Sequence, residues 1–217
     1  SNSVFHVYDH RLKEAVRVGP GTGNWVSLSG MPAHVWGAAM ATEDFNFFTH
    51  EGFSRTFIGR ALRLNLRTRR YAYGGSTITQ QLVKNLFLTR HKTLARKLAE
   101  AVLVWQVERH VSKRRILALY VNCIEYGPRI YGIRNAARRY FGTNVSRLSP
   151  VESAFIMNIK PFPWTGYYIF QKRMLTRFFA KRAEVIKKRL LGRGYISGEQ
   201  AESMVATNLY TRFINDL

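Results

Sequence analysis

Two adjacent carboxylates, Glu43 and Asp44, lie in a stretch crowded with aromatic residues, ATEDFNFFTHEGF over 41–53. A carboxylate surrounded by apolar side chains loses hydration, and its proton affinity rises. Such a group becomes a usable acid or base near neutral pH. The residues alone support two interpretations equally well: a general base in an active site, or the end of a helix that faces water.

A third carboxylate, Glu100, ends the stretch RKLAE over 96–100. Arg96 precedes it by four residues, which places the two side chains on one face of a helix. The simplest interpretation is a structural Arg–Glu pair at the start of a buried helix. The alternative is a second active-site carboxylate that Arg96 and Lys97 hold in place.

Cations, hydroxyl groups and an amide recur between residues 76 and 97. Taken singly, each cation is an ordinary surface residue. Together with the free N–H groups at the start of a helix, such a set can bind phosphate. The members of this candidate phosphate site are Ser76, Thr77, Gln81, Lys84, Arg96 and Lys97.

Several kinds of site have no support in the sequence. His50 is a lone imidazole without an H-E-x-x-H motif or a Cys/His cluster, so we expect a hydrogen-bonded structural residue near the site and no zinc centre. No G-x-S-x-G, Walker or G-x-G-x-x-G motif supports a serine hydrolase, P-loop or Rossmann protein. The lone cysteine, Cys123, excludes an internal disulfide.

The elements that must position these side chains are mostly helical from Pro32 onward. Capping boxes at 77–80 and 149–152 indicate two helix starts. An almost wholly apolar run within 94–110 predicts a buried helix. A basic amphipathic pattern predicts one long helix over about 168–191.

Residues 1–28 differ from the rest, because strand-like segments there indicate a short β-hairpin. No linker or repeat divides the chain. We therefore expect one mainly α domain over 1–217, in which 1–28 form an N-terminal extension. The chain begins with Ser instead of Met, and we expect it to be part of a longer protein.

The charge of the chain predicts a partner rich in negative charge. Its 34 Lys and Arg exceed its 13 Asp and Glu, for a net charge of +21. Nucleic acid, an anionic membrane and a phosphorylated substrate all fit this charge. Residues 52–75 hold six arginines, no acid and interleaved apolar residues. We interpret them as a mobile amphipathic segment on an anionic membrane, in preference to a solvated helix and loop.

Five ordered motifs resemble those of the bacterial peptidoglycan glycosyltransferases, glycosyltransferase family 51. This family comprises monofunctional enzymes and the N-terminal domains of bifunctional penicillin-binding proteins. The motifs are EDFNFFTHEG at 43–52, GGSTITQQLVKN at 74–85, RKLAE at 96–100, KRRILALYVN with YGPRIYGIRNAARRYFG within 113–142, and LSPVESAFIMNIKP at 148–161.

The resemblance implies a lysozyme-like, mainly α fold and an inverting enzyme that polymerises lipid II into β-1,4-linked glycan strands. It places the reaction on the outer, periplasmic face of the bacterial cytoplasmic membrane, which residues 52–75 would contact. The implied partners are lipid II and the lipid-linked glycan strand, without nucleic acid, and a further domain or anchor outside this chain. The resemblance implies no obligatory cofactor and leaves open a divalent ion, Mg²⁺ or Mn²⁺, at the pyrophosphate.

By position in the motifs, Glu43 corresponds to the general base and Glu100 to a second essential carboxylate that serves the leaving pyrophosphate. Asp44 and His50 support the first motif. These roles require both catalytic carboxylates to face one cleft. The residues that the resemblance places around the phosphate and sugar of the donor are Ser76, Thr77, Gln81, Lys84, Arg96 and Lys97.

The chain departs from the family in the fourth and fifth motifs. Arg115 and Ala118 replace usual acids, Pro128 and Arg129 interrupt a glycine-rich stretch, and NIKPFPW replaces L-P-x-x-P. The first three motifs are intact, so these departures bear on acceptor binding and processivity more than on catalysis. Two other interpretations are a lysozyme-like glycan-cleaving enzyme and an inactive basic module of the same fold that binds membranes or nucleic acid.

Overall fold

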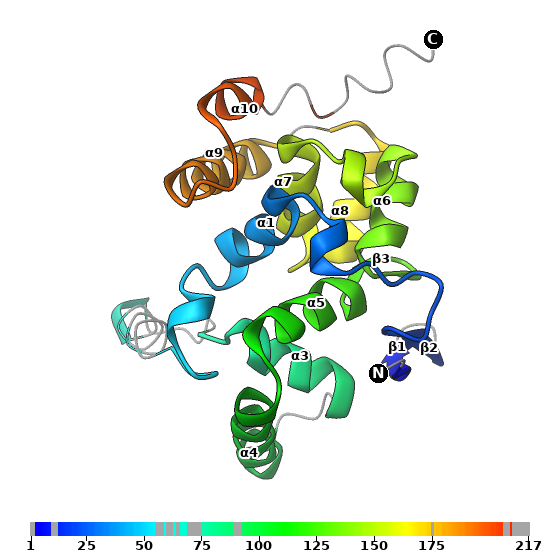
Figure 1. Cartoon of the computed structure of the whole chain (residues 1–217), viewed down its shortest axis with the longest axis vertical. Helices are drawn as coiled ribbons and strands as arrows, with labels where there is room; N and C mark the ends of the chain where they lie inside the picture. The colour runs from blue at the N-terminus through cyan, green and yellow to red at the C-terminus, as the bar shows by residue number, and fades with distance from the viewer. Residues whose placement is uncertain are drawn as a thin grey trace. The chain divides into compact units, whose positions relative to one another are not determined.

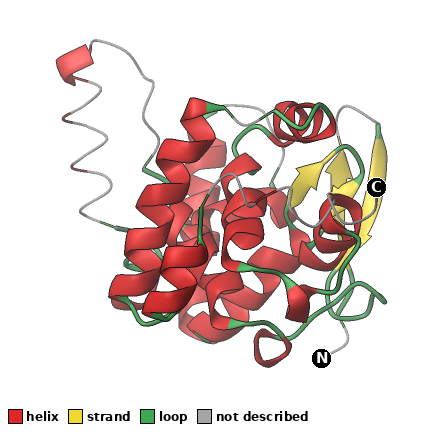
Figure 2. Ribbon diagram, turned by 90° about the horizontal axis from the view of Figure 1, so that it is seen from above, coloured by secondary structure: helices red, strands yellow, loops and turns green. Residues whose placement is uncertain are grey.

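Helices dominate the computed structural model, and its described strands form two small antiparallel sheets (Figure 2). The structure describes residues 3–9, 13–54, 59, 63, 66–68, 75–88, 93–174, 176–205 and 209. The mainly α class and the N-terminal hairpin are thereby confirmed. Within these residues, no helix combines the length and the apolar character needed to cross a bilayer.

The chain separates into two compact units. Unit 1 comprises Ser1–Phe45 and Val121–Leu217, and unit 2 comprises Asn46–Tyr120. The first predicted motif therefore ends in a different unit from the one in which it begins. The interpretation of 1–217 as a single domain stays a prediction.

The centre of unit 1 is helix α7, Pro150–Ile159, whose residues from Val151 to Ile159 are all buried. Helices α1, Ala33–Glu43, and α9, Arg177–Gly192, pack against it (Figure 1). The predicted capping box starts α7, since the Ser149 side chain accepts from the N–H of Glu152. Because α1 packs against α7, the residue that follows α7 lies beside the end of α1, where Glu43 is located.

Two hairpins flank these helices in unit 1. Strands β1, Phe5–Asp9, and β2, Glu14–Val18, pair antiparallel, as do β3, Glu125–Gly127, and β4, Ile130–Tyr131. The hydroxyl of Tyr131 donates to the buried carboxylate of Asp9 at 2.9 Å. This bond ties the N-terminal hairpin to the fourth motif.

The prediction of one long helix over 168–191 is wrong, because the structure has two helices there. Helix α8, Pro163–Gln171, ends before Arg173, whose φ of +50° is left-handed. Helix α9 then starts at a new N-cap, where the Thr176 hydroxyl accepts from the Phe179 N–H at 3.2 Å. A local cap thus overrides the amphipathic period.

The remaining described elements of unit 1 are η1, Leu28–Gly30; α6, Ile133–Phe141; η3, Val145–Arg147; and α10, Gly198–Ser203.

Unit 2 contains η2, Phe47–Thr49; α3, Ile78–Phe87; α4, Leu94–His110; and most of α5, Lys113–Cys123. Helix α3 packs against α4, and the predicted capping box of Thr77 and Gln80 is present. Most of the segment 52–75 lies outside the described residues. Its contact with a membrane stays a prediction.

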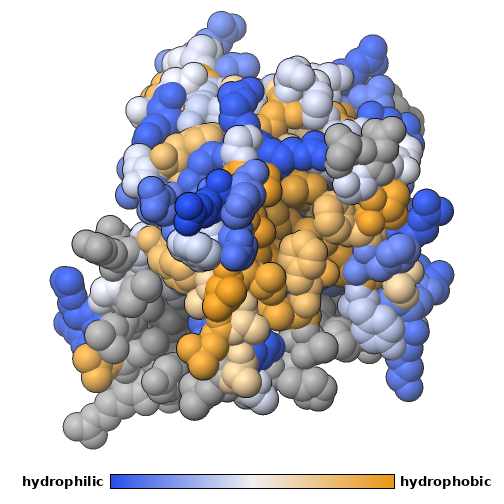
Figure 3. Space-filling view, turned by 60° about the horizontal axis from the view of Figure 1, so that its bottom comes forward, coloured by the Kyte–Doolittle hydropathy of each residue, from blue (hydrophilic) through white to orange (hydrophobic). Residues whose placement is uncertain are grey.

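The prediction that α4 is buried is wrong. Leu98, Val102 and Trp105 are 70%, 59% and 53% exposed, whereas Glu100 and Val104 are buried. Helix α3 covers only part of the apolar surface of α4. One apolar face of α4 therefore remains exposed. Large apolar side chains reach the surface elsewhere too, and Figure 3 shows a face where they gather between hydrophilic ones.

Candidate active site

Glu43 is the last residue of α1, and its carboxylate meets a lysine that follows α7. Lys160 Nζ donates to Glu43 Oε2 at 3.1 Å, across 117 positions of sequence. The two side chains are 15% and 12% exposed. Burial lowers the pKa of Lys160, and the negative charge of Glu43 opposes that shift. The packing of α1 on α7 therefore gives the predicted base a cationic partner.

Cations also surround the residues next to Glu43. Asp44 is 1% exposed and follows directly on α1. The guanidinium carbons of Arg189 and Arg193 lie 5.3 and 4.6 Å from the ring centre of Phe45. Arg189 also donates to the carbonyl of Ala41, where the negative end of the helix dipole favours a cation. The environment of the pair in unit 1 is thus more cationic than the phenylalanine-rich sequence indicates.

A tyrosine of unit 1 lies within the electrostatic reach of Glu43. The Tyr126 hydroxyl is fully buried and donates to the carbonyl of Val121 at 3.1 Å. Burial raises its pKa well above 10, and Cys123 and Glu43 raise it further. Tyr126 is therefore neutral and acts as a hydrogen-bond donor. Sequence reasoning assigned no role to Tyr126 or Lys160, although both lie in quoted motifs.

Glu100, on α4 in unit 2, is 3% exposed and has three hydrogen-bond donors. Its Oε1 accepts from Lys97 Nζ and from Gln80 Nε2, the latter at 3.4 Å. Its Oε2 accepts from Arg96 Nη1 at 3.4 Å. The Arg–Glu pair expected from the spacing is present. We call Gln80, Arg96, Lys97 and Glu100 the Glu100 cluster.

Gln80 connects the Glu100 cluster to the start of α3. Its Oε1 accepts from the Thr77 N–H at 2.9 Å, while its Nε2 donates to Glu100. One amide thus completes a helix cap and orients a buried carboxylate. The sequence showed Gln80 as a capping residue, and nothing in its spacing from residue 100 indicated the second role.

The predicted phosphate-binding residues of α3 differ in their surroundings. The buried Thr77 hydroxyl donates to the carbonyl of Gly52 at 2.6 Å. Gln81 accepts from the Tyr120 hydroxyl at 3.2 Å and donates to the carbonyl of Ser76 at 3.4 Å. These contacts fix the start of α3. Lys84 is exposed in the last turn of the same helix.

The predicted cations of α4 remain partly accessible. Lys97 is 53% exposed in its side chain and Arg96 is 17% exposed. The Nε of Arg96 is buried and has no hydrogen-bond partner among the described residues. Its pairing with Glu100 therefore uses only part of the hydrogen-bonding capacity of Arg96.

The end of the first motif packs into unit 2. His50 lies edge-on to Phe47, with ring centres 6.3 Å apart. Lys113 Nζ lies 4.4 Å from the centre of the buried Phe47 ring and pairs with Glu108 at 2.8 Å. Glu108 also accepts from the hydroxyl of Thr79 on α3. His50 is thus part of the packing around η2.

Gly52 is required by the same packing. Its φ is +79°, and a Cβ there would lie 2.5 Å from Cγ1 of Val104 on α4. A larger residue would also displace the carbonyl that Thr77 binds. The glycine of the first motif therefore lets α3 and α4 approach the loop closely.

The divergent residues of the fourth motif build a turn. Pro128 and Arg129 connect β3 to β4, and Arg129 has a left-handed φ of +59°. Its Nε pairs with Glu14 of β2 at 3.3 Å, an exposed contact. The substitutions replace glycine freedom with a contact to the N-terminal hairpin. Ala118, in place of an acid, is buried in α5.

The structure thus groups the predicted site residues into two clusters. Glu43 and Asp44 belong to unit 1, together with Lys160. The other predicted site residues, from His50 to Glu100, belong to unit 2. That the two carboxylates face one cleft stays a prediction.

Comparisons with known proteins agree on one family. A family model described as Transglycosylase matches residues 11–190. The chain is 40% identical over 201 residues to penicillin-binding protein 1A of Aquifex aeolicus, covering 92% of this chain and 27% of that protein. It is 42% identical over 181 residues to the biosynthetic peptidoglycan transglycosylase of Nitrosomonas eutropha, covering 83% of this chain and 71% of that protein.

Among solved structures, penicillin-binding protein 1A from Haemophilus influenzae matches 93% of this chain and 20% of its own, with 21% sequence identity. The TM-score of this match is 0.44.

Proposed function

The chain belongs to the transglycosylase family, a family of peptidoglycan glycosyltransferases, and on that basis we propose that it joins lipid II units into β-1,4-linked glycan strands. The observation that carries the proposal is the family match over residues 11–190, which contain both Glu43 and Glu100. The chain spans 27% of one relative and 71% of another, so the activity proposed is that of this part alone.

In the proposed reaction, the 4-hydroxyl of the acceptor N-acetylglucosamine attacks the anomeric carbon of the donor N-acetylmuramic acid. The bond from that carbon to the phosphate oxygen breaks, and its electron pair leaves with the lipid pyrophosphate. Glu43 accepts the hydroxyl proton as general base. Attack opposite to the leaving group inverts the anomeric carbon. Lys160 orients the Glu43 carboxylate for this transfer, which the 3.1 Å contact supports.

The leaving side of the reaction needs cations more than a proton, because a pyrophosphate is already acidic. Charge-assisted hydrogen bonds from Lys and Arg stabilise the charge that develops there. Arg96 and Lys97 supply such donors, and Glu100 holds both in place from its buried position. Lys84 adds an exposed cation on α3. Unlike glycoside hydrolysis, this reaction needs no acid for the leaving oxygen.

A divalent ion at the pyrophosphate would have to take its ligands largely from the substrate. No group of three or more His, Cys, Asp or Glu able to hold a metal occurs in the described part of the chain. Both oxygens of Glu100 already accept from the side chains of its cluster. The protein residues thus do not fit a protein-built metal site, and we derive no step through a metal.

The membrane setting of this reaction is also part of the proposal. Lipid II is a membrane lipid, and the similarity to peptidoglycan transglycosylases supports a reaction at the outer face of the cytoplasmic membrane. The net charge of +21 supports attraction to an anionic surface. Moenomycin, a phosphoglycolipid inhibitor of the family, should compete with the donor for the cations of the Glu100 cluster.

A polymerisation assay tests the proposal. The protein is incubated with labelled lipid II in detergent, and products are tested for digestion by lysozyme. We expect Glu43→Gln to reduce polymer formation by about a thousandfold, because the amide cannot accept the hydroxyl proton. The matched control is Glu184→Gln, which changes an exposed carboxylate paired with Lys187 on α9.

The outcomes separate the competing functions. Polymer made by Glu43→Gln at the parent rate would remove Glu43 from the mechanism. Shortened sacculi without polymer would favour the glycan-cleaving enzyme. Salt-sensitive binding of oligonucleotides, with no use of lipid II, would favour the inactive module.

A further inference from the structure

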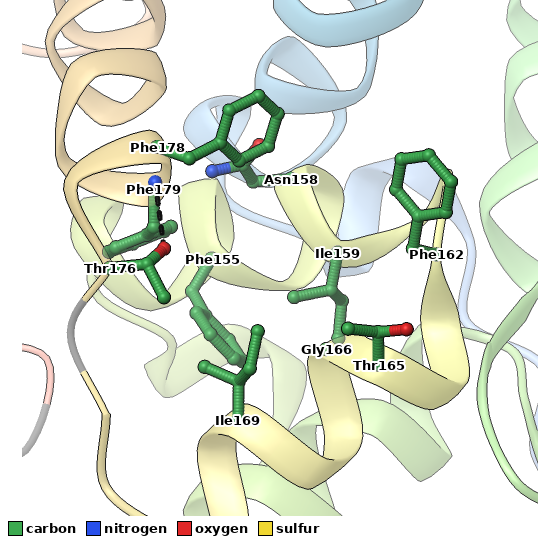
Figure 4. A pocket seen from close by; sticks show the side chains of 10 residues that line it. All are labelled: Phe155, Asn158, Ile159, Phe162, Thr165, Gly166, Ile169, Thr176, Phe178 and Phe179. Atoms are coloured by element: carbon green, nitrogen blue, oxygen red, sulfur yellow. Dashed lines mark hydrogen bonds between the residues drawn. The ribbon is translucent and has the colours of Figure 1, made fainter.

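Unit 1 contains an apolar pocket that the proposed reaction does not use. It has a volume of about 120 Å³ and lies between α7, α8 and the start of α9 (Figure 4). Phe155, Ile159, Ile169 and Phe179 form its walls. The rings of Phe155 and Phe179 pack against each other at 5.3 Å, which keeps the walls in place.

Two exposed aromatic rings also line the pocket. Phe162 is 66% exposed and Phe178 is 59% exposed, and Figure 4 shows them apart from each other at the same edge of the pocket. Leaving such rings in water is unfavourable unless a partner covers them. The pocket and these rings form one continuous apolar site, which an aliphatic chain fits better than a polar ligand.

The pocket also contains a buried polar side chain, Asn158. Asn158 is 5% exposed, and its Oδ1 has no hydrogen-bond partner among the described residues. Asn158 and the exposed Phe178 both line this pocket (Figure 4). Buried amides are normally hydrogen-bonded, so this position favours an occupant that carries a donor, such as a hydroxyl, near the exposed edge.

The surroundings of the pocket are basic. Residues 153–183 contain no Asp or Glu. The guanidinium carbon of Arg182 lies 5.5 Å from the ring centre of Phe178, and Lys172 Nζ lies 4.6 Å from that of Tyr168, itself 58% exposed. Aromatic rings with cations beside them are typical of protein surfaces at the boundary of a lipid bilayer.

We propose that this pocket holds an acyl chain of an anionic phospholipid whose headgroup carries hydroxyls. The chain end contacts Phe155, Ile159 and Ile169, and the phosphate lies toward Arg182. A headgroup hydroxyl donates to Asn158. Helix α8 and the start of α9 are then a lipid-contact surface of unit 1, distinct in sequence from 52–75. This site is independent of lipid II and of the proposed catalysis.

Sedimentation with vesicles that contain no lipid II tests the site. The parent protein should bind phosphatidylglycerol–phosphatidylcholine vesicles more tightly than phosphatidylcholine alone. Phe162→Ser combined with Phe178→Ser should weaken binding by about tenfold, since two rings no longer leave water. The matched control is Leu191→Ser with Val205→Ser, which removes two exposed apolar side chains away from the pocket. Segment 52–75 is unchanged in every variant, so its contribution cancels.

A pocket-filling variant separates a bound chain from a merely apolar surface. Thr165→Trp enlarges an exposed pocket residue on α8, and Gln171→Trp adds the same side chain elsewhere on that helix. A chain in the pocket predicts weaker vesicle binding for Thr165→Trp alone, by about fivefold or more, because the chain loses its buried area. A generally apolar surface predicts equal or tighter binding for both variants. Circular dichroism melts verify that each variant is folded.

Two results would overturn the proposal. One is parent-like vesicle binding by both Thr165→Trp and the Phe162/Phe178 double variant. The other is binding sensitive to these substitutions only when a polyprenyl-linked substrate is added, which would assign the pocket to the substrate lipid instead. Neither result bears on polymerisation by the Glu43 and Glu100 clusters.

Discussion

The two predicted catalytic carboxylates are held in opposite ways. Glu43, in unit 1, pairs with Lys160 from 117 positions away. Glu100, in unit 2, takes its cations from three and four positions earlier on the same helix. The first arrangement depends on the packing of α1 against α7, whereas the second needs one helix and one neighbouring amide.

The different origin of the cations suits the two carboxylates to different roles. The Lys160 ammonium is 15% exposed and is committed to a buried pair, so it serves orientation. Lys97 is 53% exposed and Arg96 is 17% exposed, so both cations are partly accessible to a ligand while Glu100 pairs with them. A fixed base and adaptable cations suit the two sides of a displacement with an anionic leaving group.

The largest expected effect that separates the clusters is on activity. Glu100→Gln should lower polymerisation by about a hundredfold, less than Glu43→Gln, because it removes charge organisation without removing the base. The measurement is the rate of lipid II polymerisation at saturating substrate. Parent-like activity would leave Glu100 with the structural role that the Arg–Glu spacing first indicated.

The next effect is on stability and concerns unit 1. Lys160→Met should lower the free energy of unfolding by about 3 kcal/mol, because it leaves the mostly buried Glu43 carboxylate without this cation. Urea denaturation measures the loss. Adding Glu43→Gln should recover most of it, since the buried charge is then gone. A double variant as unstable as the single one would show that Lys160 stabilises unit 1 by packing alone.

Acid should weaken unit 1 through His34. Its Nδ1 lies 3.1 Å from the Ser153 hydroxyl, and burial lowers its pKa from 6.5 to about 4, against the opposing charge of Glu152. Between these values the unfolded chain binds a proton that the folded chain does not. Stability therefore falls as pH drops from 6.5 to about 4, by about 3 kcal/mol at most.

The test of this acid effect is thermal unfolding across that pH range in the parent and in His34→Asn. The asparagine can replace the hydrogen bond to Ser153 without titrating, so its curve should be flatter. Parallel curves for both proteins would assign the acid sensitivity to other groups.

The smallest stability effect belongs to the Glu100 cluster. Lys97→Met should change the free energy of unfolding by less than about 1 kcal/mol, because Lys97 is half exposed and the buried Glu100 carboxylate keeps its contacts with Arg96 and Gln80. The same variant should raise the KM for lipid II if Lys97 binds the donor phosphates. A stability loss as large as that of Lys160→Met would erase the contrast between the two clusters.

Local patterns in the sequence predicted most elements. The capping boxes at Thr77 and Ser149 and the N-terminal hairpin are where the sequence indicated them. Two predictions failed where competing signals were comparable. The Thr176 cap divides the helix expected over 168–191, and α4 exposes Trp105 although its sequence predicts burial. A high content of apolar residues in a helix does not show whether another element covers those residues.

The sequence alone identifies the family, the mainly helical class and the two cations beside Glu100, because the family follows from ordered motifs and Arg96 and Lys97 lie within about one helical turn of Glu100. The partner of Glu43, the second role of Gln80 and the apolar pocket lined by Phe178 became visible only in the folded chain. Each of these depends on side chains from separate helices meeting in space. No periodicity along the chain encodes such a meeting, because it is set by how complete helices pack.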